Sequence, residues 1–158
     1  GCQVMAELKD IIPGANHWPK LEKNVSDRFE ARLVQVKINK SNSPFFKGME
    51  GSQLLVPVNH GEGKMVFSDN INLKKYISNN LIPMQFSTNS GVVAKLFPEN
   101  PNGSFLGTTA VTNLDGRFLI MMPHPERSFL NSQLSWTDKK EKYSPWFRLF
   151  LNAREFCN

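Results

Sequence analysis

The sequence predicts an α/β fold in which helices flank a mixed sheet. Its 158 residues match the length of a single domain, and 40% hydrophobic with 21% charged residues is typical of a globular core. Segments with the two-residue alternation of strands intermix along the chain with segments that have helical spacing. Because no internal repeat and no linker divides the chain, we expect one sheet covered by its own helices.

The first half predicts an N-terminal helix followed by strands. Helical spacing relates Val4, Leu8, Ile11 and Ile12. This spacing predicts a short helix with one buried face, which ends at Pro13–Gly14. Residues 28–38 predict a strand, and the alternation changes phase after Leu33, as in a bulged strand or one covered on both faces. Further strands are expected at 53–58 and 64–67.

The second half continues the alternation of helices and strands. Residues 71–80 predict a surface helix whose turn positions include Ile71, Lys74 or Lys75, and Ile77 or Ser78. The predicted elements that follow are a hairpin of 81–87 and 91–97, a loop at 97–104, and strands at 108–112 and 117–122 around a turn at 113–116.

The last segment, "SPWFRLFLNAREFCN", predicts a helix. Ser144 is expected at the N-cap and Pro145 at the first helical position. The predicted buried stripe comprises Trp146, Leu149, Phe150 and Ala153.

Composition excludes several classes of protein. No apolar run approaches the roughly 20 residues that cross a bilayer, and no export signal is present, so we expect a cytoplasmic protein without a membrane partner. The net charge of +5 permits binding to nucleic acid, but the basic residues are scattered among acidic ones, and "TDKKEKYS" is typical of a solvated loop. Cys2 and Cys157 follow no paired spacing, which predicts free thiols.

Cys2 is the first candidate nucleophile. A sharp strand-to-helix turn that presents a nucleophile has a glycine two residues before it and another two residues after it, because a side chain there would collide. Cys2 lies next to its glycine and has Val4 two residues on, so it does not fit. If Gly1 is the trailing glycine, the nucleophile belongs two positions upstream of Gly1.

The second candidate is His124 with Glu126, around Pro125 after an apolar strand. In an extended segment residues two apart point to the same side, so an imidazole and a carboxylate would face one cleft. A histidine oriented by an acid can serve as general base for a thiol or hydroxyl. The alternative is a surface turn in which Glu126 pairs with Arg127.

The segment "VNHGEGK" is the third candidate. Two glycines after a strand would let a small polar ligand approach the backbone, although an ordinary glycine turn between strands has the same pattern. We expect no metal site and no cofactor in this chain. The spacing of the three histidines matches no common ligand pattern, and two glutamates add little: His17, His60, His124, Glu62 and Glu126.

These segments together carry a family resemblance. "GCQ" before a helix resembles the end of the G-x-C-x-G-x-Q motif of class I glutamine amidotransferases, and "HPE" resembles their second motif. "WPKLEKNVSDRFEAR", "VNHGEGK", "ENPNGS", "MMPHPER" and "SPWFRLFLNAR" resemble the C-terminal glutaminase domain of the phosphoribosylformylglycinamidine synthases, in their large single-chain form. In this register residues 1–158 are a partial amidotransferase domain that lacks the N-terminal half and the nucleophile elbow.

The resemblance implies a function and a set of site residues. An upstream cysteine would attack glutamine, His124 would be its base and Glu126 would orient the base. Gln3 and the loop of Asn59, His60 and Gly61 would hold the glutamine substrate. Ammonia would pass to the synthetase domain of the same parent chain, where ATP and Mg²⁺ activate formylglycinamide ribonucleotide for purine biosynthesis. The chain alone is expected to be inactive.

Other functions stay open at this point. A basic module for nucleic acid or an acidic partner would use the positive charge, and a stand-alone thiol hydrolase would use Cys2. The chain could also be the glutaminase part of another amidotransferase. Loss of half a sheet would expose apolar surface, which a dimer could cover.

Overall fold

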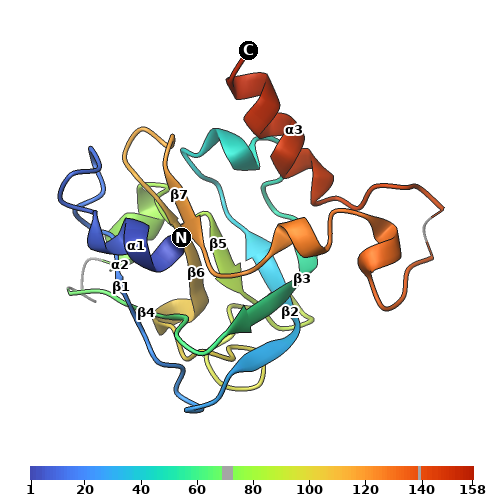
Figure 1. Ribbon diagram of the computed structural model, residues 1–158, viewed down its shortest axis with the longest axis horizontal. Coiled ribbons are helices and arrows are strands. Elements are labelled where there is room, and N and C mark those ends of the chain that lie inside the picture. Colours follow the sequence, from blue (N-terminus) through green and yellow to red (C-terminus); the bar gives the residue numbers. More distant parts are fainter. Residues whose placement is uncertain (69–72, 139) are drawn as a thin grey trace.

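The computed structural model describes residues 1–68, 73–138 and 140–158, and it confirms the α/β class (Figure 1). The helices are α1 (Cys2–Glu7), α2 (Leu73–Ser78) and α3 (Phe147–Phe156). The strands are β1 (Lys20–Glu22), β2 (Glu30–Ile38), β3 (Gln53–His60), β4 (Lys64–Val66), β5 (Met84–Phe86), β6 (Thr108–Thr112) and β7 (Leu119–Met121). Single 3₁₀ turns are η1 (Pro44–Phe46), η2 (Phe105–Gly107), η3 (Pro125–Arg127) and η4 (Asn131–Gln133).

The main sheet has five strands in the order β3-β2-β5-β6-β7, and β1 pairs with β4 in a separate ribbon. Every strand pair in the described part of the chain is antiparallel, whereas the sequence predicted a mixed sheet. Antiparallel neighbours need no crossover helix, and the short turn between β6 and β7 joins them directly. The strands on either side of the glycine loop belong to different sheets: β3 lies in the main sheet and β4 in the two-stranded ribbon.

Strand β2 alternates without the phase change that the sequence predicted. Its register with β3 is regular from Glu30 opposite His60 to Lys37 opposite Gln53. Glu30 is buried at an inward position, and Leu33 is an exposed apolar residue. The sequence pattern shifts because a polar side chain occupies the buried face at the start of the strand, and the register with β3 shows no bulge there.

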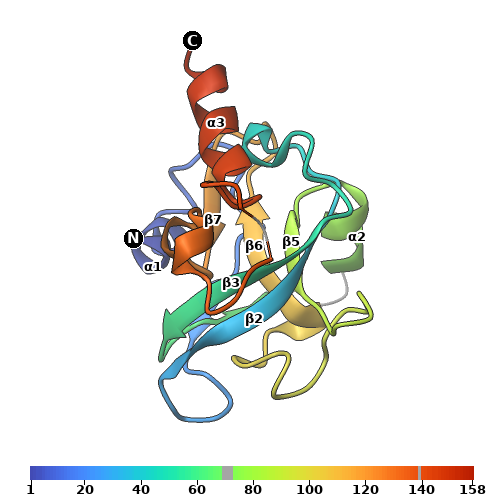
Figure 2. The ribbon, with the colours of Figure 1, turned by 90° about the vertical axis from the view of Figure 1, so that its right-hand side faces the viewer.

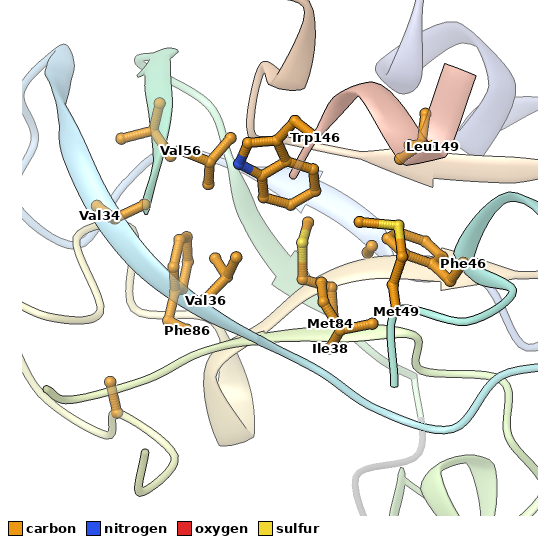
Figure 3. Packing of buried hydrophobic residues seen from close by; sticks show 13 residues of the cluster. Val34, Val36, Ile38, Phe46, Met49, Val56, Met84, Phe86, Trp146 and Leu149 are labelled. Atoms are coloured by element: carbon orange, nitrogen blue, oxygen red, sulfur yellow. The ribbon is translucent and has the colours of Figure 1, made fainter. Parts of the chain in front are cut away.

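Two buried clusters cover the main sheet. One cluster contains inward residues of β2, β3 and β5 together with η1 and α3, and Figure 3 shows the Trp146 indole in this cluster with Val56 and Leu149. The other contains residues of α1, α2 and β4 with Ile120 of β7. The neighbours Ala110 and Val111 of β6 belong to different clusters, as expected for a strand that is buried on both faces.

The N-terminal helix is shorter than predicted, and its predicted apolar face is wrong. Val4, Leu8 and Ile11 are 62%, 43% and 75% exposed. The buried residue of α1 is Ala6, and Ile12 packs against the core from the turns that follow. Because the helix ends at Glu7, the spacing of the later apolar residues is not helical and does not build one face.

Two further elements differ in extent. Helix α2 occupies the middle of its predicted range, and Ile71 lies outside the described residues. The predicted hairpin of 81–87 with 91–97 is reduced to an isolated bridge between Ser87 and Val93. Since β2 and β6 already pair with both edges of β5, no edge is left for a second hairpin strand.

Helix α3 confirms the C-terminal prediction with a shifted start. The Ser144 hydroxyl accepts the Trp146 N–H at 3.2 Å, so it satisfies an N–H ahead of the helix that begins at Phe147. Phe150 is 37% exposed, whereas the polar Asn152 is buried. Figures 1 and 2 show α3 extending from the body of the molecule to the C-terminus.

The cysteines and the helices were both the subject of sequence-based predictions. Cys2 and Cys157 are both free thiols. Among the described residues no helix is long and apolar enough to cross a membrane.

Candidate active site

One cavity of about 470 Å³ collects most of the residues that the sequence singled out. Its walls come from the start of α1, the end of β3 with the loop after it, and the end of β7 with the segment after it. The lining residues are Gly1, Cys2, Gln3, Asn59, His60, Gly61, Glu62, Met121, Met122 and His124. Segments far apart in sequence thus meet where β3 and β7, the two edge strands of the main sheet, approach each other at their ends.

Backbone contacts bring His124 beside the glycine loop. After β7 the His124 N–H donates to the Pro57 carbonyl of β3 at 2.8 Å. The same strand, three residues on, carries His60 into the cavity wall. Trp146 of the α3 segment donates its indole N–H to Leu55 of β3 at 2.7 Å, which anchors this strand from the other side.

His124 and Glu126 form the predicted pair. The His124 Nδ1 atom lies 2.6 Å from Glu126 Oε1, whereas the Arg127 Nε atom lies 3.8 Å from the same oxygen. The carboxylate therefore accepts its hydrogen bond from the imidazole rather than from Arg127. The segment is not extended as predicted: Pro125 opens the turn η3, and this turn brings the Glu126 carboxylate back to the ring.

Two buried asparagines hold the glycine loop. The Asn24 amide donates to the His60 carbonyl at 2.8 Å, and its oxygen accepts the Gly63 N–H at 3.1 Å. The Asn102 amide donates to the Gly63 carbonyl at 2.7 Å. The loop backbone is thus fixed from two sides, and Asn59 and Gly61 are held at the cavity wall.

His60 is a neutral histidine at physiological pH. Its side chain is buried, and this burial, together with the neighbouring charge of His124, lowers the pKa of His60 to about 4, against the smaller opposing effect of Glu30. Its Nε2 atom lies 3.3 Å from the Asn102 amide nitrogen. His60 therefore contributes a polar, uncharged ring to the cavity.

The start of α1 presents Cys2 and Gln3 differently. The Cys2 thiol donates to the Met121 carbonyl at 2.8 Å, so it is bound to the backbone of β7 as a thiol. The exposed Gln3 amide donates to Glu62 at 3.1 Å and bridges α1 to the glycine loop across the cavity. The hydrogen bond described for the Cys2 thiol goes to a carbonyl and not to a histidine or a carboxylate, which is consistent with the sequence argument against Cys2 as nucleophile.

The sequence model of a protein family, the CobB/CobQ-like glutamine amidotransferase domain, matches residues 1–157. The chain belongs to this glutamine amidotransferase family. The amidotransferase domain is also similar to a solved structure titled "Structure of PurLQS from Thermotoga maritima", with a TM-score of 0.62 and 21% sequence identity. The match covers 89% of this chain and 53% of that one, so the domain spans about half the length of its structural relative. At this identity the likeness establishes the fold.

The domain brings together all the predicted glutamine-binding residues and His124, and Glu126 joins them through its hydrogen bond. The sequence did not identify Asn24 or Asn102 as parts of the site, whereas Gly63 belongs to the predicted segment "VNHGEGK". Both asparagines lie in loops, and nothing in their spacing indicates contact with residues about forty positions away. The one signal that could have indicated them is that Asn24 lies in "WPKLEKNVSDRFEAR" and Asn102 in "ENPNGS", two of the segments that carry the family resemblance.

His17 does not join the site. It hydrogen-bonds to the Thr112 carbonyl at 2.9 Å and lines a separate cavity of about 560 Å³. Burial lowers the pKa of His17, although this hydrogen bond opposes the shift. Within the described ranges no group of three or more His, Cys, Asp or Glu side chains is placed to hold a metal ion.

Proposed function

We propose that this amidotransferase domain is part of the glutaminase of a phosphoribosylformylglycinamidine synthase, acting in the cytoplasm. The observation that carries the proposal is the shared cavity, in which the paired His124 faces the "NHG" loop and the start of α1. The similarity to PurLQS supports this choice among amidotransferases. The resemblance of the long segments "SDRFEAR" and "SPWFRLFLNAR" points to the same enzyme.

The proposed reaction uses His124 as the proton carrier. A thiol loses its proton to His124 Nε2 and attacks the amide carbon of glutamine, and the imidazolium then protonates the departing ammonia. Water hydrolyses the resulting thioester to glutamate and restores the thiol. Glu126 accepts the Nδ1–H of His124 throughout, which keeps the Nε2 lone pair directed to the reaction.

We place the nucleophile two residues before Gly1 in the parent protein. The motif register puts it there, and the hydrogen bond of Cys2 to the Met121 carbonyl supports this placement. The ammonia is then used in the synthetase domain of the parent chain, with ATP and Mg²⁺. The chain by itself is expected to release no ammonia from glutamine.

The exposed apolar side chains of the N-terminal segment support a covering partner. Val4, Leu8 and Ile11 are exposed and form no part of either buried cluster. We propose that the preceding part of the amidotransferase domain covers them in the parent protein. In the isolated chain, a dimer is the alternative cover, and sedimentation would detect it.

The test uses the full-length parent protein with two nitrogen donors. His124→Ala should abolish glutamine-dependent synthesis and preserve synthesis from ammonium chloride, since the synthetase site is untouched. Equal loss with both donors would contradict the proposal.

An electrophilic glutamine analogue should label the cysteine upstream of Gly1, and Cys2→Ala should leave turnover within about tenfold, or ~1.4 kcal/mol. A label on Cys2 would show that the register is wrong.

A further inference from the structure

The cavity contains two imidazoles, and only one of them can serve as the base. His60 and His124 both line it, and they lie close enough for the charge of one to affect the other. The contacts around each ring determine where its proton sits and whether its lone pair is free. For His60 these contacts come from Asn102, a residue of the loop before β6.

The orientation of the Asn102 amide is fixed independently of His60. Asn102 is fully buried. Its oxygen accepts the Ser104 N–H at 3.0 Å and the Ser104 hydroxyl at 2.8 Å, and its nitrogen donates to the Gly63 carbonyl at 2.7 Å. A reversed amide would lose the bonds to the Ser104 N–H and the Gly63 carbonyl, so the group that lies 3.3 Å from His60 Nε2 is an NH₂ donor.

This donor determines the tautomer of His60. Because the Asn102 N–H needs an acceptor, the Nε2 atom of His60 carries the lone pair, and the ring proton lies on Nδ1. The Nδ1 atom is buried and has no hydrogen-bond partner in the described chain. A buried donor without a partner costs free energy, so the Asn102 contact must outweigh this cost.

His124 has the same tautomer as His60, but its Nε2 lone pair is free. Glu126 accepts from its Nδ1, so in the neutral ring the lone pair again lies on Nε2. No described residue hydrogen-bonds to that Nε2 atom, and the ring is 31% exposed. The two imidazoles thus differ in one respect that matters for proton transfer: the Nε2 lone pair of His60 is occupied, and that of His124 is free.

We propose that Asn102 is a positioning residue that assigns the base role to His124. It occupies the lone pair of His60, keeps that ring uncharged, and so leaves His124 as the imidazole that accepts the thiol proton. This inference rests on the proposed glutaminase function for its catalytic consequence. The tautomer itself does not depend on that function.

The first test reads the tautomers directly by ¹⁵N NMR of the histidine-labelled 158-residue chain. The chain has three histidines, so single substitutions assign the signals. We expect His60 to show an unprotonated Nε2 and a protonated Nδ1 at pH 7. A proton on His60 Nε2 in the wild-type chain would overturn the proposal, whatever any variant does.

The second test replaces the donor with an acceptor. In Asn102→Asp, a carboxylate faces Nε2, so His60 should carry a proton there, either as the other tautomer or as imidazolium. Asn100→Asp is the matched control. Asn100 is equally buried in the same loop, and it bonds to Ser104 O and Gly103 N but makes no contact with His60. His60 should keep its wild-type tautomer in this control, and the same change in both variants would refute the proposed role.

Activity of the parent protein gives the catalytic readout. Asn102→Asp should lower the kcat for L-glutamine at pH 7 by tenfold or more with KM within about threefold, because a carboxylate and a proton on His60 Nε2 replace the neutral pair beside His124 and disturb its action as the base. Synthesis from ammonium chloride should be unchanged. A kcat for Asn102→Asp no lower than that for Asn100→Asp would overturn the assignment. A parent with the expected tautomers but no glutamine-dependent synthesis would instead overturn the proposed function.

Discussion

Hydrogen bonds and close contacts of single residues fix the geometry of the cavity. Glu126 is more than half exposed, yet its carboxylate accepts a hydrogen bond from the His124 ring. Gly63 contributes by having no side chain, since a Cβ there would lie 2.1 Å from His60 Cδ2 and 2.2 Å from His60 Nε2. Glu126 thus contacts the ring of His124, and Gly63 leaves room for the ring of His60.

The loss of the Glu126 charge should be less harmful than the loss of the base. In the parent protein Glu126→Gln should lower the kcat for glutamine about hundredfold, since the ring is kept but poorly oriented, and His124→Ala should lower it by ~10⁴ or more. Steady-state kinetics with glutamine measures both values. A Glu126→Gln enzyme with wild-type turnover would show that the 2.6 Å contact has no catalytic role.

Gly63→Ala should destabilise the chain by about 1–3 kcal/mol, because the new Cβ overlaps a buried ring that Asn102 holds in place. Gly61→Ala is the control for stability, since its Cβ would meet only Phe29 at an ordinary 3.7 Å, and we expect a change within ~0.5 kcal/mol. Urea denaturation compares the two. Equal stability of both variants would mean that His60 moves freely.

Elements that lie outside the cavity hold its walls in register. Strand β3 carries Asn59 and His60, and its middle is bonded to the Trp146 indole. Helix α3 is attached in turn through Asn152, whose amide donates to the carbonyls of Phe45 and Lys47 at 2.8 Å each. The C-terminal helix thus supports the sheet edge at which the site lies.

Asn152→Leu should lower the free energy of unfolding by roughly 2 kcal/mol, because it leaves two carbonyls without their donor. The control on the same helix is Arg148→Ala, whose exposed ion pair with Glu155 contributes little, within ~0.5 kcal/mol. Chemical denaturation of the chain measures the difference. An Asn152→Leu variant as stable as Arg148→Ala would show that α3 is held by its apolar contacts alone.

At the scale of the whole molecule, the buried histidine links stability to pH. The pKa of His60 is about 4 in the folded chain against an ordinary value of 6.5. His60 in the unfolded chain therefore binds a proton below pH 6.5, whereas His60 in the folded chain binds it only below about pH 4. The stabilising effect of a neutral His60 is complete above pH 6.5 and is lost as the pH falls from 6.5 to 4.

The free energy of unfolding should consequently fall by ~2 kcal/mol between pH 7 and pH 5 from His60 alone. The lowered pKa of His17 acts in the same direction. Urea titrations at the two pH values measure the total, and the non-titrating His60→Gln isolates the share of His60. If His60→Gln loses as much stability as the wild type over this interval, the proton uptake lies elsewhere.

Local patterns in the sequence determined the elements that lie within one segment of chain. The α/β class, the β6–β7 hairpin, the C-terminal helix and the His124–Glu126 pair depend on near neighbours, and spacing and turn residues encode such contacts directly. Prediction was wrong where burial depended on distant residues, as for the exposed Leu8. Polar Glu30 on the buried face of β2 misled the reading of that strand for the same reason.

The tertiary structure alone decided which loops meet and which polar groups are paired. Asn102 reaches Gly63 and His60 because β6 and β3 belong to one folded sheet, and no short-range pattern specifies a hydrogen bond across about forty residues. The low pKa of His60 follows from the fold as well, since burial and the neighbouring charge of His124 lower it. The sequence supplied the chemical groups of the site, and long-range packing gave them their partners and kept His60 uncharged, because both depend on desolvation and on neighbours that only the fold provides.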